Sequence, residues 1–222
     1  MILERLHAEY PEALCALDHD DPWQLLIATI LSAQCTDERV NRTTPALFAR
    51  WPTPAALAGA DITAVEEVVH PTGFFHMKAL AVTAMSQDVV TRFGGEVPRT
   101  MDELTSLRGV GRKTANVVLG VAHGVPGLPV DTHVTRLAGR LRLSRDTDPV
   151  RIEAALCALV PPAEWTGFSL RLILHGRRVC VARRPRCGGC MLRDVCPSAD
   201  VAVMATRRST GGATSRRGPA PT

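Results

Sequence analysis

Lysine is almost absent from this sequence of 222 residues. Of its 26 basic residues only two, Lys78 and Lys113, are lysines. Lys113 follows a Gly-Val-Gly turn in the segment LRGVGRKTANVVLG, residues 107–120. A guanidinium cannot form a Schiff base, so a lysine kept here in an arginine-rich chain favours amine chemistry.

Long apolar runs are also missing. The longest, LLIATIL, has seven residues, far fewer than the roughly 20 that a membrane-spanning helix needs. The N-terminal segment MILERLHAEYPEAL places charges within its apolar pattern, unlike a signal peptide. These two features lead us to expect a soluble and cytoplasmic protein, and a hydrophobic content of 45% predicts that it is globular.

Strand-like alternation and fixed-period repeats are absent as well, and almost every segment has helical spacing. Asp21 and Pro22 are expected to open one helix, and Thr36 or Asp37 the next, which Pro45 should interrupt. Gly94 and Gly95 should end a long helix. The sequence therefore predicts an all-α fold.

Charge is unevenly distributed. Residues 1–100 carry 13 acidic and 7 basic residues, whereas residues 101–222 carry 9 acidic and 19 basic residues. The basic half suggests a polyanionic partner, although an arginine-rich soluble surface would look the same. The composition of residues 199–222 predicts a disordered basic tail.

Four of the seven cysteines lie close together: Cys180, Cys187, Cys190 and Cys196, spaced C-x6-C-x2-C-x5-C. Four thiolates this close predict a metal centre, since disulfides are rare in cytosolic proteins. A single tight pair with two outer cysteines favours [4Fe-4S] over zinc, and the absence of any metal stays a third possibility. The basic loop VARRPR between the first two cysteines could contact phosphates.

The segment LRGVGRK reads as a hairpin between two helices. Glycines allow the backbone to approach a phosphate, and the N–H groups that open a helix bind anions. Lys113 lies in the first turn of the second helix, where the helix dipole and Arg112 should lower the pKa of its amine. We interpret it as a nucleophile, with phosphate binding as the alternative.

Asp131 in VDTHV is a plausible helix N-cap, and a capped carboxylate could also face positive charge on a substrate. His133 could reach a phosphate or could be a packed structural histidine. The sequence leaves both choices open.

With these residues in place, the chain resembles the endonuclease III family of iron–sulfur, helix-hairpin-helix DNA glycosylases. ILSAQCTD, GEVP, GVGRKTANVV, VDTHV, LILHGR and the four cysteines occur in the family's order over most of residues 10–198. The resemblance implies two helical domains with DNA between them: a six-helix domain at 16–125, and a [4Fe-4S] domain at 1–15 and 126–198. It also implies a monomer that acts near the nucleoid.

The resemblance further implies bifunctional removal of oxidised pyrimidines from double-stranded DNA, followed by strand cleavage at the abasic site. Lys113 matches the nucleophile and Asp131 the catalytic carboxylate. The residues expected to contact DNA are Gln34, Phe74, Arg108, Gly109, Gly111, Arg112 and His133.

Two residues depart from the family pattern. Arg108 stands where proline is common, and Phe74 stands where leucine is usual. Phe74 could be a wedge into DNA or a core aromatic. The rival functions are a monofunctional glycosylase similar to adenine glycosylases, and a non-catalytic iron–sulfur protein that binds DNA.

Overall fold

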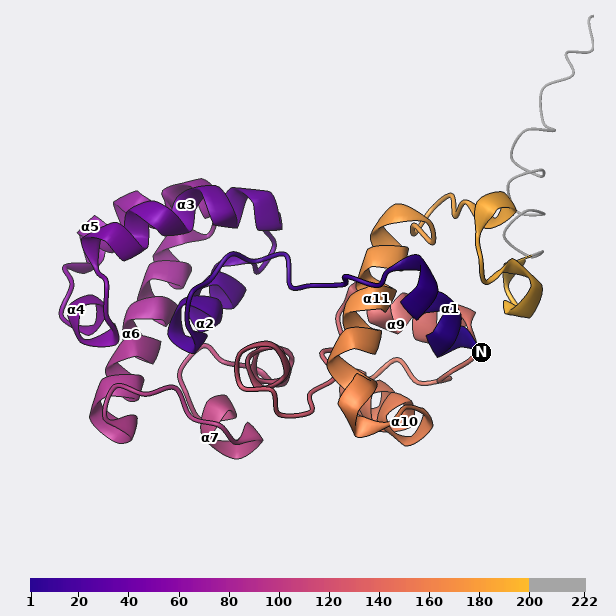
Figure 1. Cartoon of the computed structure of the whole chain (residues 1–222). Coiled ribbons are helices and arrows are strands. Elements are labelled where there is room, and N and C mark those ends of the chain that lie inside the picture. Colours follow the sequence, from indigo (N-terminus) through magenta and orange to yellow (C-terminus); the bar gives the residue numbers. More distant parts are fainter. Residues whose placement is uncertain (200–222) are drawn as a thin grey trace, which may run out of the picture. The chain divides into compact units, whose positions relative to one another are not determined.

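The computed structural model describes residues 1–199, and within them the chain is helical with no strand (Figure 1). This confirms the predicted all-α class. The chain divides into two compact units. We call residues 13–129 and 160–170 the hairpin unit, and residues 1–12, 130–159 and 171–199 the cysteine unit. The predicted tail lies outside the described residues except for Ala199, which is buried.

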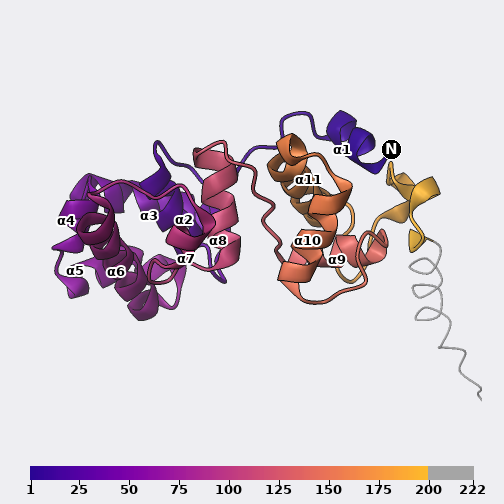
Figure 2. The ribbon, with the colours of Figure 1, turned by 90° about the horizontal axis from the view of Figure 1, so that it is seen from below.

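The hairpin unit holds most of the helices. They are α2 (Pro22–Leu31), α3 (Asp37–Arg50), α4 (Pro54–Ala58), α5 (Ile62–Val69), η1 (His70–Thr72), α6 (Phe75–Phe93), α7 (Met101–Thr105), α8 (Arg112–Val117), the π-helical η2 (Val118–Ala122) and η3 (Pro162–Glu164). The long helix α6 packs against α2, α4 and α5 (Figures 1 and 2).

Capping residues fix several helix starts. Asp21 accepts a hydrogen bond from the Gln24 N–H at 2.8 Å, and Pro22 opens α2 as expected. Thr36 caps α3. The expectation that Pro45 interrupts this helix is wrong, because α3 runs through it to Arg50. Proline removes one backbone donor, and the rest of the helix buries an apolar face that outweighs this loss.

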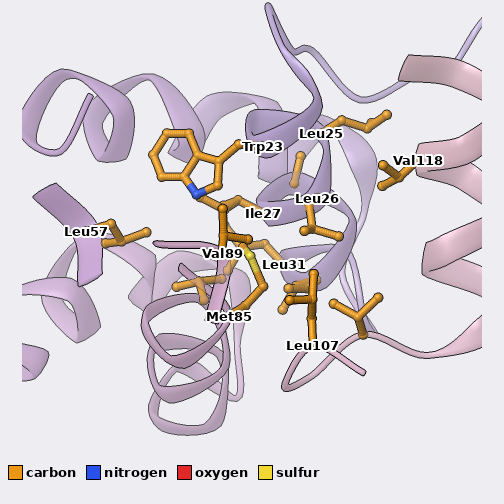
Figure 3. Close-up of a cluster of buried hydrophobic side chains, with 14 of the residues drawn as sticks. Trp23, Leu25, Leu26, Ile27, Leu31, Leu57, Met85, Val89, Leu107 and Val118 are labelled. Atoms are coloured by element: carbon orange, nitrogen blue, oxygen red, sulfur yellow. The ribbon is translucent and has the colours of Figure 1, made fainter. Parts of the chain in front are cut away.

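A continuous apolar core stabilises the hairpin unit. Helix α2 is buried along nearly its whole length, and Trp23 donates its indole N–H to the Ser86 hydroxyl at 3.1 Å. The central side chains are Trp23, Leu25, Leu26, Ile27, Leu31, Leu57, Met85, Val89, Leu107 and Val118 (Figure 3). The burial of this apolar surface stabilises the packing of α3, α6 and α8 in the hairpin unit.

The cysteine unit contains α1 (Ile2–Glu9), α9 (Thr132–Arg140), α10 (Pro149–Leu159), the end of α11 (Trp165–Arg178), η4 (Cys187–Gly189) and η5 (Arg193–Val195). Leu6 of α1 is fully buried, and Arg5 forms a bidentate ion pair with Asp194. This ion pair connects α1 to Asp194, which lies 189 positions later in the sequence. No helix within residues 1–199 is both long and apolar enough to span a membrane.

Candidate active site and cysteine centre

The turn between α7 and α8 forms the predicted helix-hairpin-helix. Gly109 has φ +79°, in the left-handed region, and a Cβ there would lie 3.1 Å from the Cβ of Ala81. The backbone conformation therefore favours glycine, and a larger residue would also crowd Ala81. Gly111 differs: its φ of −93° suits any residue, and no atom lies within 4 Å of the position of its Cβ. Because glycine has no side chain, a ligand could approach the backbone at the start of α8 closely.

Lys113 is the second residue of α8 and is exposed. Its amine makes no hydrogen bond or ion pair within residues 1–199, so the nitrogen is available to a substrate. Arg112, next to it, is also exposed.

Arg108 braces the hairpin from within. Its backbone N–H and its Nε both donate to the Asp88 carboxylate of α6, at 2.9 and 3.1 Å, and one terminal nitrogen reaches the Ala84 carbonyl at 3.0 Å. Burial raises the pKa of Asp88, but the hydrogen bonds from Arg108 outweigh this, and the pKa lies below its ordinary value. The ion pair with Asp88 therefore anchors this turn to α6. DNA contact by Arg108 stays a prediction.

Three residues in left-handed backbone conformation line one pocket of the hairpin unit. Gln34 has φ +53°, Phe74 has φ +49° and Gly109 has φ +79°. Lys78 lines the same pocket. Non-glycine residues adopt this conformation rarely, and they cluster at functional sites when they do. The pocket brings together three of the predicted DNA-contacting residues.

Phe74 is the N-cap of α6, and 64% of its surface is exposed. The core-aromatic interpretation is therefore wrong, because the burial it requires is missing. The next residue, Phe75, packs against the core instead. The use of Phe74 as a wedge stays a prediction.

Asp131 and His133 belong to the cysteine unit. Asp131 caps α9, accepting the Val134 N–H at 2.8 Å, as the sequence suggested. His133 is half-buried, burial lowers its pKa, and its Nδ1 lies 3.1 Å from a terminal nitrogen of Arg136. A Cβ on Gly176 of α11 would meet His133 at 3.0 Å, so this glycine allows α9 and α11 to pack closely. The capping role of Asp131 is settled, whereas its catalytic role and a phosphate contact by His133 stay predictions.

All four clustered cysteines line a single pocket of the cysteine unit, together with Leu137, Leu141 and Leu192. Burial raises the pKa of Cys187 and Cys190, because a thiolate is poorly solvated there. Among the described residues, no three His, Cys, Asp or Glu side chains form a group that could hold a single metal ion. The donor set, four sulfur atoms around one apolar pocket, fits a centre that binds through four thiolates.

Two residues that the sequence interpretation missed surround these sulfurs. One terminal nitrogen of Arg140 lies 3.2 Å from the Cys180 Sγ, and the two terminal nitrogens donate to the carbonyls of Val181 and Ala182 at 2.9 and 2.7 Å. His175 Nε2 lies 3.4 Å from the Cys190 Sγ, and its Nδ1 lies 3.1 Å from the Tyr10 hydroxyl.

Burial lowers the pKa of His175, which favours the neutral ring. If the Tyr10 hydroxyl donates to Nδ1, the proton of the neutral ring lies on Nε2 and can be donated to the Cys190 sulfur. His175 lies within the family motif LILHGR, and this motif could have identified it as a candidate residue near the cysteines. Arg140 is one of many arginines in this half of the chain, and its neighbours in the sequence gave no sign that it contacts the cysteine segment.

The chain is similar to known DNA repair proteins along most of its length. Residues 27–162 match the HhH-GPD superfamily base excision DNA repair protein family. Endonuclease III of Synechocystis sp. is 54% identical over 200 residues, which cover 90% of each chain.

Solved structures agree. A non-covalent endonuclease III–DNA complex gives a TM-score of 0.88 at 38% identity, covering 91% of this chain and 95% of that one. A trapped endonuclease III–DNA covalent intermediate gives 0.87 at 39% identity, covering 90% and 95%. The chain therefore belongs to the HhH-GPD superfamily of base excision DNA repair proteins, and within it to the endonuclease III family of bifunctional DNA glycosylases with AP lyase activity.

Proposed function

We propose that this chain removes oxidised pyrimidines from double-stranded DNA and cuts the strand at the resulting abasic site, with Lys113 as the nucleophile. The observation that carries the proposal is the exposed Lys113 amine directly after a hairpin whose Gly109 conformation only glycine adopts easily. An amine free of internal partners is what attack on a sugar carbon requires.

In the proposed reaction, the Lys113 nitrogen bonds to C1′ of the extruded nucleotide, and the bond from C1′ to the base breaks. The departing base takes up a proton, and ring opening gives a Schiff base. Loss of the C2′ proton then allows β-elimination, which breaks the C–O bond on the 3′ side. Asp131 stabilises the positive charge that develops on the sugar or accepts a proton from the amine.

The DNA contacts follow from the hairpin and the pocket. The N–H groups around Gly109 and Gly111 would bind a phosphate of the damaged strand, because they precede the first turn of α8 and no side chain within residues 1–199 occupies the space beside Gly111. Arg108, Arg112 and His133 would add positive or polar contacts. Gln34 would fill the gap left by the extruded nucleotide, and Phe74 would enter the base stack.

Cys180, Cys187, Cys190 and Cys196 would hold a [4Fe-4S] cluster. When bound, the cluster would cross-link residues 180–196, a segment with little regular structure of its own. It would thereby fix Arg183 and Arg184 of the VARRPR loop, both exposed, for phosphate contacts. The four sulfur donors, and the hydrogen bonds that Arg140 and His175 direct at two of them, support this assignment.

The protein would act as a monomer, in the cytoplasm at the nucleoid. Domain boundaries at 16–125, and at 1–15 with 126–198, would separate the hairpin from the cluster.

Borohydride trapping tests the nucleophile. Lys113→Arg keeps the positive charge but cannot form a Schiff base, so it should bind abasic duplex DNA normally and lose strand cleavage by roughly 10³-fold or more. Wild-type protein mixed with borohydride and a duplex containing thymine glycol or an abasic site should give a covalent adduct. Arg112→Lys is the matched control, because it leaves Lys113 in place and should still be trapped. Strand cleavage at the normal rate by Lys113→Arg would refute the assignment.

A further inference from the structure

The second lysine of the chain is buried beside the proposed wedge. Lys78 lies in the first turn of α6, and only 4% of its surface is exposed. Burial lowers the pKa of its amine, while the nearby Cys35 thiol group acts in the opposite direction. Lysine is among the residues least often buried without a partner. The partner here is the backbone carbonyl of Thr72, which accepts a hydrogen bond from Nζ at 2.7 Å.

That carbonyl belongs to the turn that presents Phe74. Thr72 ends η1, and the next two residues, Gly73 and Phe74, both have left-handed backbone conformations, with φ +70° and +49°. For glycine this is easy, but for phenylalanine it is strained and lasts only where the surroundings hold it. Phe74 itself is mostly exposed, so contacts of its ring do not supply the restraint.

The restraint comes from the backbone on either side. Lys78 of α6 holds the Thr72 carbonyl, and an Arg39 terminal nitrogen of α3 donates to the Pro71 carbonyl at 3.3 Å. The Thr72 hydroxyl closes the turn by donating to the Val69 carbonyl at 2.8 Å. Side chains from two helices therefore donate hydrogen bonds to the successive carbonyls of Pro71 and Thr72, and only Gly73 separates these residues from Phe74.

We propose that Lys78 is a positioning residue that holds Phe74 exposed and ready to enter the DNA base stack. The inference rests on the proposed function, in which Phe74 is the wedge. A wedge whose backbone is already held with the ring exposed loses less conformational entropy on binding, so nucleotide extrusion is favoured. Lys78 thus acts on the extrusion step and not on the chemistry at Lys113.

The test separates extrusion from chemistry by using two substrates. An abasic site in duplex DNA requires extrusion, whereas an abasic site in a single-stranded oligonucleotide does not. Lys78→Met keeps the apolar stem and roughly the volume of the side chain but removes the donor. Compared with wild type, it should lower the borohydride trapping rate on the duplex about tenfold, and on the single strand less than twofold. The fluorescence of 2-aminopurine opposite the abasic site should rise more slowly.

Phe74→Ala gives the second arm. It should show the same duplex-specific loss, and the Lys78→Met, Phe74→Ala double variant should be no slower than Phe74→Ala alone, because both changes act on one step. Arg39→Met, at an exposed position, should give a smaller duplex-specific loss and keeps the inference testable if Lys78→Met folds poorly. Arg42→Met, also exposed on α3 but paired with Glu38, is the matched control and should match wild type on both substrates.

Failure of the inference and failure of the proposed function would look different. If Phe74→Ala shows the duplex-specific loss but Lys78→Met and Arg39→Met do not, the positioning role is wrong and the wedge stands. Equal loss on both substrates, or additive losses in the double variant, would likewise overturn it. If Phe74→Ala trapping matches wild type on the duplex, the wedge is wrong and the role of Lys78 falls with it.

Discussion

The two units of this protein are stabilised by different means. The hairpin unit is built around an apolar core in which α2 is almost wholly buried, and it contains all three tryptophans. The cysteine unit has its own buried leucines and isoleucine, but residues 180–199 include only short 3-10 turns. In that segment Leu192 and Ala199 are buried, and Arg5, Arg140 and the four thiols supply further contacts.

The difference shows how each unit supports its own candidate functional residues. In the hairpin unit, Gln34 and Phe74 keep strained backbone conformations next to an apolar core, and hydrogen bonds from Lys78 and Arg39 hold the turn before Phe74. The cysteine unit is the more basic one, with 13 basic and 8 acidic residues among those described, against 9 and 13 in the hairpin unit. Like charges repel one another, and the proposed cluster would offset part of this repulsion by cross-linking the four cysteines.

The largest expected effect is on the cysteine unit alone. Cys190→Ala should lose most of the bound iron and make residues 180–199 sensitive to protease, because the remaining three sulfurs cannot close the site. Tryptophan fluorescence, which reports only on the hairpin unit, should stay native. Iron content, visible absorption and limited proteolysis measure this.

Cys157→Ala is the control, because that residue of α10 does not line the cysteine pocket. A Cys190→Ala protein with its full iron content would show that the pocket does not need four thiolates.

A smaller effect is expected at the ion pair that braces the hairpin. Asp88→Asn weakens the hydrogen bonds from Arg108 and should lower the free energy of unfolding by about 1–3 kcal/mol at pH 7. Because the folded pKa of Asp88 lies below the ordinary value of about 3.9, this stabilisation is present above that value and is lost as pH falls through the folded pKa. Urea unfolding followed by tryptophan fluorescence at pH 7 and at acidic pH measures it.

The contribution of the Asp88 charge should shrink steadily as the carboxylate takes up a proton. A difference between wild type and Asp88→Asn that stays constant down to acidic pH would contradict the role of the carboxylate charge.

The smallest effect on stability is expected at Asp131. Asn caps helices about as well as Asp, so Asp131→Asn should leave the melting temperature nearly unchanged, whereas Asp131→Ala should cost about 1 kcal/mol. If the carboxylate also serves catalysis, both variants should slow base release, by roughly 10²-fold. Single-turnover release of thymine glycol, measured beside thermal unfolding, separates the two roles; normal release by Asp131→Asn would leave only the cap.

The sequence predicted those features that depend on neighbours along the chain. The starts of α2, α3 and α9 follow from Asp21, Thr36 and Asp131, because a cap acts over three residues. Gly94 ends α6 for the same local reason. Pro45 was misjudged because its local cost is outweighed by packing of the whole helix.

Other features depend on residues distant in the sequence, and spacing alone could not predict them. The bond from Arg108 to Asp88 spans twenty positions, and the contacts of Tyr10 with His175 and of His175 with Cys190 join three segments of the chain. The exposure of Phe74 also depends on tertiary structure, since the next residue, another phenylalanine, packs against the core.

By itself, the sequence determined the helical class, the glycine hairpin before Lys113 and the set of four cysteines. Each of these features depends on the types of residues that lie close together along the chain. Only the tertiary structure decided that Gln34, Phe74 and Gly109 line one pocket, and that Lys78 donates a hydrogen bond to the turn before Phe74. The physical reason is that helix formation is governed by local contacts, whereas backbone strain and buried hydrogen bonds are maintained by packing between distant segments.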